Sequence, residues 1–138
     1  MMRTKLSLSP FKKWLRSVIV PAGPGVIIPG KWVMYEYYSE PHNELLHIEE
    51  ELLKKENLYW EIVFEHKGLF KQNSNIPVKF LGDEKVGCWS YSGNYLTIKS
   101  EGHKEIFQFA LVKGKLRLLK KDRTGRIVFF GFFKKQPV

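Results

Sequence analysis

The second half of the chain alternates between short apolar runs and breaks that carry glycine. From residue 86 to residue 135 each run is long enough for one strand, and each break spans two to four residues. Strands that recur about every 10 residues with a turn signal between them are typical of all-β sandwiches and barrels. Turns this short make consecutive strands antiparallel neighbours, so the pattern predicts a meander. The breaks fall at residues 92–94, 100–102, 113–114 and 122–125.

Two earlier stretches alternate in the same way. Residues 32–38 predict a first strand, with Trp32, Met34 and Tyr38 on one face. Residues 58–65 predict another, with a large apolar side chain at every second position. Both strands are amphipathic enough to contribute one face to a shared core.

Residues 43–56 change to the period of a helix. Leu45, Ile48 and Leu52 form an apolar stripe, and charged residues lie mostly on the other side. Asn43 is the predicted N-cap. A long polar strand is the alternative, which three consecutive glutamates disfavour. We expect the helix to lie against the barrel or across one of its mouths.

Residues 1–29 are predicted to form a basic segment that precedes a barrel domain of residues 30–138. Residues 11–20 have the spacing of a short amphipathic helix, which prolines and glycines then end. The apolar core of this segment is too short for a secretory signal, because lysine and arginine interrupt it. We therefore expect a cytoplasmic protein, with export as the alternative. No apolar run approaches the length of a transmembrane segment.

Two further strands depart from simple alternation. Residues 76–81 predict a short edge strand, because Pro77 has no amide hydrogen for a ladder. Residues 127–133 are apolar on both faces, so one face would line a barrel interior. The other face would need the helix, the N-terminal segment or a second subunit as a cover, and Gly131 predicts a bulge or a close backbone approach. The interior face is predicted to hold Ile127, Phe129 and Phe133, and the outer face Val128, Phe130 and Phe132.

Charge is unevenly distributed around the net +9 of the chain. Residues 1–30 carry five basic residues and no acid, residues 31–57 carry three basic and seven acidic residues, and residues 58–138 carry fifteen basic and seven acidic residues. A basic body attracts nucleic acid or an anionic membrane surface, so both are candidate partners.

The single cysteine, Cys88, excludes an internal disulfide bond, fits a reducing compartment and is predicted to be a small buried apolar residue.

Several short motifs occur in the order found in one group of barrels. The first strand opens with Gly30, Lys31 and Trp32 as a G-x-W motif. With the motifs that follow it, the chain resembles the small bacterial lipocalin-like (calycin-type) barrels over about residues 30–135. The resemblance implies an up-and-down antiparallel β-barrel of about eight strands, with a helix between the first two. The later motifs are Trp60, Phe64 and Gly68; Gly87, Cys88 and Trp89; Tyr95, Leu96 and Ile98; Phe107 and Phe109; and Leu116, Leu118 and Leu119.

Two features of the secreted lipocalins differ in this chain. Their Thr-Asp-Tyr loop motif is absent. In place of their late arginine, we expect Lys134 or Lys135 to pack over the ring of Trp32. Such a cation–π contact would close one end of the barrel.

The resemblance also implies a barrel with an interior cavity. We expect it to bind a small hydrophobic or amphipathic molecule there, without catalysis and without a cofactor. The alternative is that the same side chains simply fill the core. The predicted ligand-lining residues are Trp60, Ile62, Phe64, Trp89, Tyr91, Leu96, Phe107, Phe109, Phe129 and Phe133.

The alternation of basic and apolar residues along 113–126 predicts a hairpin with a basic outer face. It would bind a polyanion, or it would be a solvated edge on which lysine discourages pairing with other strands. A third hypothesis is assembly through Phe130 and Phe132, so we expect a monomer or a homodimer. The four histidines are not spaced for metal binding, and no metal site is predicted. The predicted basic patch consists of Lys115, Arg117, Lys121, Arg123 and Arg126.

Overall fold

A computed structural model describes residues 4–5, 28–41, 44–77 and 85–136. Within these residues the chain forms ten strands and one short helix. The predicted helix at residues 11–20 and most of the predicted edge strand at residues 76–81 lie outside the described residues. The strands are β1 (Thr4–Lys5), β2 (Gly30–Ser39), β3 (Leu46–Ile48), β4 (Trp60–Phe64), β5 (Leu69–Ser74), β6 (Val86–Ser92), β7 (Tyr95–Ser100), β8 (His103–Val112), β9 (Lys115–Lys121) and β10 (Ile127–Gln136), and the helix is α2 (Glu50–Lys55).

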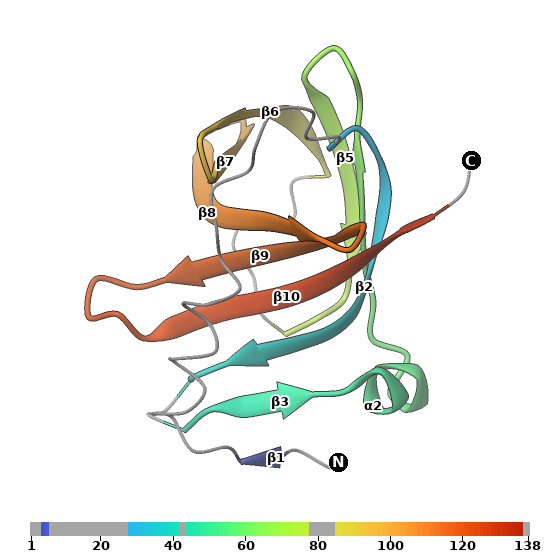
Figure 1. The fold of residues 1–138 in the computed structure, drawn as a ribbon, viewed down its shortest axis with the longest axis vertical. Coiled ribbons are helices and arrows are strands. Elements are labelled where there is room, and N and C mark those ends of the chain that lie inside the picture. Colours follow the sequence, from blue (N-terminus) through green and yellow to red (C-terminus); the bar gives the residue numbers. More distant parts are fainter. Residues whose placement is uncertain (1–3, 6–27, 42–43, 78–84, 137–138) are drawn as a thin grey trace.

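One antiparallel sheet closes on itself to form a barrel (Figure 1). Its strands follow the order β1-β3-β2-β10-β9-β8-β7-β6-β5-β4, and a further pairing of β2 with β4 completes the ring. Eight strands, β2 and β4 to β10, therefore form the barrel, and β3 and β1 extend the sheet outside it. Strands β4 to β9 each pair with the next strand along the chain, so the predicted up-and-down barrel is confirmed.

The stretch predicted as one long helix divides into a strand and a helix. β3 pairs with residues 37–39 of β2, and these main-chain hydrogen bonds replace those that the first helical turns would make. α2 therefore begins after Glu49 rather than after the predicted cap, Asn43. Leu52 and Leu53 of α2 pack into the cluster of side chains that fills the barrel, so the short helix lies at one end of the barrel (Figure 1).

A bulge on β2 reverses which side chains face the interior. β10 passes directly from Phe132 to Phe133 where β2 has an extra residue, Tyr35. Side chains before the bulge face the barrel at even-numbered positions, and those after it face the barrel at odd-numbered positions. Tyr37 therefore joins the interior cluster, while Tyr38, predicted to share a face with Trp32 and Met34, packs outside.

A second irregularity lies at the start of β10. Ile127 pairs with Lys121 and Phe129 pairs with Lys120, so Val128 is an extra residue in β10. The side chain of Ile127 is consequently turned to the outside of the barrel, where it packs in the outer cluster. The prediction that it shares an interior face with Phe129 is wrong, because an extra residue in a strand changes the face of everything before it.

Two apolar clusters lie on the two sides of the sheet. The interior cluster receives a side chain from every strand of the barrel. The outer cluster lies over β2, β9 and β10, and its members Phe130 and Phe132 are buried within the single chain. Among the described residues, the cover of the outer face of β10 comes from its neighbours in this cluster, not from α2. The outer cluster contains Leu45, Leu119, Ile127, Phe130 and Phe132, with Tyr35 and Tyr38 packed against it.

Glu40 fastens the end of β2 to the start of β10. It is a buried carboxylate, and its Oε1 accepts a hydrogen bond of 2.9 Å from the backbone amide of Ile127. The backbone amide of Glu40 in turn donates to the carbonyl of Ile127 over 2.8 Å. This reciprocal pair satisfies buried polar groups at the edge of the outer cluster.

Gly131 allows an aromatic ring to lie against the strand, as its position among apolar residues predicts. A Cβ atom at this position would lie 2.2 Å from Cζ of Phe129 and 3.2 Å from Cε1 of Phe133. The ring of Phe129 therefore occupies the space that a side chain at position 131 would need. The glycine is required by packing here and not by a left-handed backbone.

We expect Gly131→Ala to lower the free energy of unfolding by about 1–3 kcal/mol, because the new methyl group overpacks the ring of Phe129. Chemical denaturation of the variant and the parent protein measures this loss. In a Phe129→Leu background the same substitution should cost clearly less, since the clashing atoms are gone. An equal cost in both backgrounds would contradict this origin.

Candidate functional site

Eight of the ten predicted ligand-lining side chains are buried in the barrel, each no more than 2% exposed. The other two lie nearer the surface: Trp89 is half-buried and Tyr91 is 49% exposed. The structure thus brings nine of the ten into one interior cluster, while Tyr91 contacts its edge through Trp89 and Phe109. The buried eight are Trp60, Ile62, Phe64, Leu96, Phe107, Phe109, Phe129 and Phe133.

The aromatic rings among these residues contact one another. The ring of Phe129 lies 5.1 Å from that of Trp60 and 5.6 Å from that of Tyr37, centroid to centroid, and Phe133 lies 5.6 Å from Trp60. These separations are those of favourable aromatic pairs. A second group links Phe64 to Trp89 (5.3 Å), Trp89 to Tyr91 (6.4 Å) and Tyr91 to Phe109 (5.9 Å).

Trp32 is held by a hydrogen bond from its indole nitrogen and by a cation–π contact over its ring. Its indole Nε1 donates a 2.7 Å hydrogen bond to the carbonyl oxygen of Ile28. The ammonium of Lys135 lies 5.6 Å from the centroid of the ring, so Lys135 makes the predicted cation–π contact. A Cβ atom on Gly30 would lie 2.5 Å from Cε of Lys135, so the glycine of the G-x-W motif makes room for the lysine stem.

Lys134, the other lysine considered for that contact, points to a different part of the molecule. Its Nζ lies 3.2 Å from Oε2 of Glu50 and 4.6 Å from the centroid of the Tyr35 ring. This pair of contacts joins β10 to α2 across β2. It forms one side of a pocket beside the barrel, whose lining also includes Met34 and Leu53 of the interior cluster.

The pocket exists because β2 changes partners along its length. Residues 30–33 pair with β4 and residues 37–39 pair with β3. In the described part of the chain, residues 34–36 pair with neither of these two strands. The sheet is forked at this point, and α2 with the connection to β4 lies beside the fork (Figure 1).

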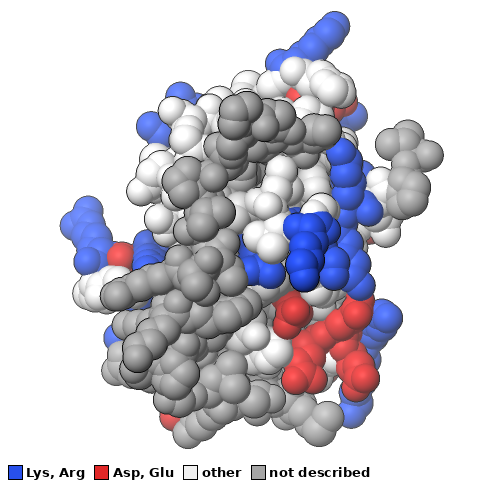
Figure 2. All heavy atoms as spheres, in the orientation of Figure 1, with Lys and Arg blue, Asp and Glu red and all other residues white. Residues whose placement is uncertain are grey.

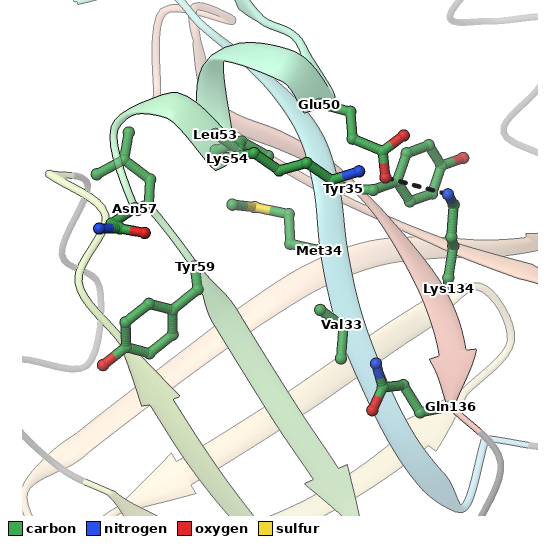
Figure 3. Close-up of a pocket in the computed structure, with 11 residues that line it drawn as sticks. Val33, Met34, Tyr35, Glu50, Leu53, Lys54, Asn57, Tyr59, Lys134 and Gln136 are labelled. Carbon is green, nitrogen blue, oxygen red and sulfur yellow. Dashed lines mark hydrogen bonds and ion pairs between the residues drawn. The ribbon is translucent and has the colours of Figure 1, made fainter.

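The fork pocket, as we call this space, has a volume of about 440 Å³. Figure 3 shows Tyr35 and Tyr59 on opposite sides of Met34, with α2 above them. Such a volume lies within the range of about 300–1,000 Å³ that is typical of small-molecule sites. The lining residues are Val33, Met34, Tyr35, Glu50, Leu53, Lys54, Asn57, Leu58, Tyr59, Lys134 and Gln136.

One wall of the fork pocket is fixed by Asn75. Its Nδ2 donates to the carbonyl of Asn57 over 2.7 Å, and its Oδ1 accepts from the backbone amide of Tyr59 over 2.8 Å. Asn57 itself has a positive φ of 54°, a conformation that asparagine tolerates at the end of a helix. The amide of Leu58 donates to the carbonyl of Leu53 over 2.8 Å. The segment between α2 and β4 is therefore held in one path.

The chemistry of the fork pocket is apolar at its base and charged at its rim. Val33, Met34 and Leu53 supply aliphatic and thioether surface, while Lys54 and Lys134 bring ammonium groups. Burial, followed by the charge of the nearby carboxylate on β2, raises the pKa of Tyr35, so this ring carries a neutral hydroxyl. The arrangement suits a ligand with an apolar body and a polar end.

The predicted basic patch is divided between two environments. Lys115 and Arg117 lie over aromatic rings, with Lys115 Nζ 5.3 Å from the ring centroid of Tyr35 and Arg117 Cζ 5.0 Å from that of Phe132. Lys121, Arg123 and Arg126 lie at the β9–β10 turn, where Lys121 and Arg123 are exposed and Arg126 is half-buried. Figure 2 shows basic and acidic side chains side by side on one face of the molecule.

Two further candidates for chemistry are the single cysteine and a possible metal site. Cys88 is exposed, so the prediction that it is a buried apolar residue is wrong. It lies on the outward side of β6, because Gly87 and Trp89 occupy the alternating inward positions. Within the described residues, no group of three or more histidine, cysteine, aspartate or glutamate side chains is arranged to hold a metal ion.

His47 joins β3 to β2 through a stacked and hydrogen-bonded contact. Its Nε2 lies 2.6 Å from Oε2 of Glu36, its Nδ1 lies 3.9 Å from Oε1 of Glu49, and its ring stacks on Tyr38 with centroids 4.1 Å apart. Burial, followed by the charges of Glu36 and Glu49, raises the pKa of Tyr38 to about 12. This cluster flanks the outer cluster and is separate from the fork pocket lining.

Comparison with protein-family models, with curated proteins and with solved structures yields no match for this chain. The fold by itself defines the class: a closed, antiparallel, eight-stranded β-barrel with an extension of its sheet and a pocket beside it. The part of the chain that the structure describes holds no helix with the length and hydrophobicity needed to cross a membrane.

Sequence analysis did not identify the fork pocket as a site. Of its lining, only Lys134 was singled out, and for a contact that Lys135 makes instead. Two local signals were present: Glu50 and Lys54 have the i, i+4 spacing of neighbours on one helix face, and Asn57 follows the helix where a left-handed residue is common. Neither signal reveals that β2 changes partners at this point.

We expect Tyr38 to ionise near pH 12, whereas an ordinary tyrosine ionises near pH 10. The unfolded chain then releases this proton before the folded protein does, so the contribution of Tyr38 to stability is lost as the pH rises from about 10 to about 12. Ultraviolet titration of the tyrosines, with Tyr38→Phe to assign the signal, measures the ionisation. Glu36→Gln should lower the pKa of Tyr38; an unchanged value would contradict the assigned cause.

Proposed function

We propose that this protein binds a small hydrophobic or amphipathic molecule without transforming it, and that the fork pocket holds this molecule. The observation that carries the proposal is a space of about 440 Å³ with an apolar base and a few polar groups at its rim. Sites for small molecules combine these two features. The likeness of the sequence motifs to lipocalin-like barrels supports a binding role in general terms.

Contacts among the interior rings support a location in the fork pocket rather than in the barrel interior. Phe129 and Phe133 are fully buried, and each ring is in contact with Trp60. Insertion of a ligand between them would sacrifice these contacts and separate paired strands. The fork pocket needs no such displacement, since it lies where β2 has no neighbour from β3 or β4.

The fork pocket is also a stable recess. Asn75 fixes its wall through hydrogen bonds to Asn57 and Tyr59, and Leu53 anchors α2 in the interior cluster. A preformed site loses little conformational entropy when a ligand binds. The proposal therefore assigns the barrel the role of a rigid support, with recognition at its side.

Met34 provides a direct reporter of binding. It lies in the fork pocket and is the one methionine beyond the first two residues of the chain. We expect small aromatic and aliphatic compounds to shift the methyl resonance of Met34 in protein carrying labelled methionine methyl groups. The cause is the contact between the ligand and the thioether. Titration at increasing ligand concentration gives the dissociation constant.

Val33→Phe is expected to abolish this binding by filling the fork pocket with a ring. Ile106→Phe is the matched control, because it introduces the same ring at an exposed β-branched residue on β8 and should leave binding intact. If ligands bind Val33→Phe and the parent protein equally, the fork pocket is not the site. Met34 belongs to the interior cluster as well, so if ligands also shift the resonances of Phe129 and Phe133, the interior holds the ligand.

A further inference from the structure

The rim of the fork pocket carries more positive than negative charge. Its lining includes the ammonium groups of Lys54 and Lys134 and a single carboxylate, that of Glu50. Within this lining, Glu50 forms an ion pair with Lys134 at 3.2 Å. One ammonium group of the rim is thus left beyond this internal pair. An excess of positive charge around an apolar recess favours an anion that has an apolar body.

The ion pair is accessible to a competitor. The side chains of Lys134 and Glu50 are 47% and 42% exposed, so both remain hydrated and their pairing adds little stability. Glu50 lies in the first turn of a helix that is six residues long, and no side chain caps that helix. A ligand carboxylate could therefore take the place of the Glu50 carboxylate at Lys134 without breaking a buried interaction.

Lys54 is placed to contact the same anion. It lies one helical turn after Glu50, and its side chain extends across the pocket toward Tyr35 (Figure 3). The ammonium of Lys134 lies 4.6 Å from the centroid of the Tyr35 ring. Both cations therefore converge near Tyr35, at one side of the fork pocket.

The opposite side of the fork pocket suits a flat ring. Tyr59 lies across Met34 from Tyr35, and it is among the large apolar side chains that remain exposed, at 38%. Thioether sulfur and aromatic rings both pair favourably with an aromatic partner. An aromatic body between Met34 and Tyr59 would place an attached carboxylate on the side of Lys54 and Lys134.

We propose that the ligand of the fork pocket is an aromatic carboxylate, and that Glu50 occupies the place of its acid group while the pocket is empty. This inference rests on the proposed function, because it names the chemical class of molecule that the same pocket takes. The acid group binds Lys134 and Lys54, and the ring lies on Met34 against Tyr59. Glu50 is then released to solvent.

The test compares two probes of equal shape and different charge, 2-naphthoate and 2-naphthamide. We expect 2-naphthoate to bind about tenfold more tightly at low salt, since charge-assisted hydrogen bonds to lysine strengthen its binding. The Met34 methyl resonance and calorimetry measure both affinities. Added salt should weaken the binding of 2-naphthoate and leave that of 2-naphthamide almost unchanged.

Variants separate the roles of the charged residues. Lys134→Met and Lys54→Gln should each reduce the preference for 2-naphthoate severalfold, whereas Lys99→Met, at an exposed position on β7, should leave it unchanged. Glu50→Gln should strengthen 2-naphthoate binding severalfold, because the internal competitor is gone. The circular dichroism spectrum of each variant checks that the barrel has folded.

Each outcome distinguishes the two proposals. Equal binding of 2-naphthoate and 2-naphthamide would overturn the carboxylate assignment and leave the proposed function standing. Failure of both probes to shift Met34 in the folded parent protein would count against the proposed function as well. If Lys134→Met weakens 2-naphthoate binding but Glu50→Gln does not strengthen it, Glu50 is no competitor and that part of the inference falls.

Discussion

Closure of the barrel depends on β2, the strand that joins the last strand of the meander, β10, to its first, β4. It pairs with β10 along most of its length, and on its other edge it pairs first with β4 and then with β3. A strand in this position must bend away from one neighbour to meet the next. The extra residue at Tyr35 supplies that bend, since a bulge increases local twist and changes the faces of the side chains that follow it. The closed barrel and the fork beside it are therefore two results of one constraint.

Two strand glycines, Gly87 and Gly131, leave space for aromatic rings that pack in the interior. At Gly87 an added Cβ atom would lie 2.1 Å from the carbonyl oxygen of Lys99 and 2.5 Å from Cε1 of Phe70, and Gly131 similarly accommodates Phe129. Glycine in a strand costs conformational entropy, but here large rings pack against the bare backbone and bury extensive apolar surface. Large side chains from all eight barrel strands therefore form one interior cluster, and the fork pocket lies where the sheet forks.

Around the same fork, the acidic and basic parts of the sequence lie next to each other. Residues 31–57 are acidic overall, and the fold lays their carboxylates beside the basic outer face of β9 and β10 (Figure 2). Glu50 meets Lys134 across β2, while Lys115 and Lys134 both approach the ring of Tyr35. Exposed ion pairs of this kind contribute little to stability.

The sequence by itself determined most strands of the barrel and their antiparallel order, but not β1 or β3. Alternating residues such as Trp60, Ile62 and Phe64 and the glycine-bearing turns are local signals, and short turns leave neighbouring strands no other partner. The tertiary structure alone decided the faces of β2 and β10, because one extra residue at Tyr35 or at Val128 reverses the side-chain direction without changing the apolar pattern. It also divided the predicted helix, since pairing with β2 outweighs a helical period over a few residues. The fork pocket depends on all of these long-range pairings at once, so no local stretch of sequence could reveal it.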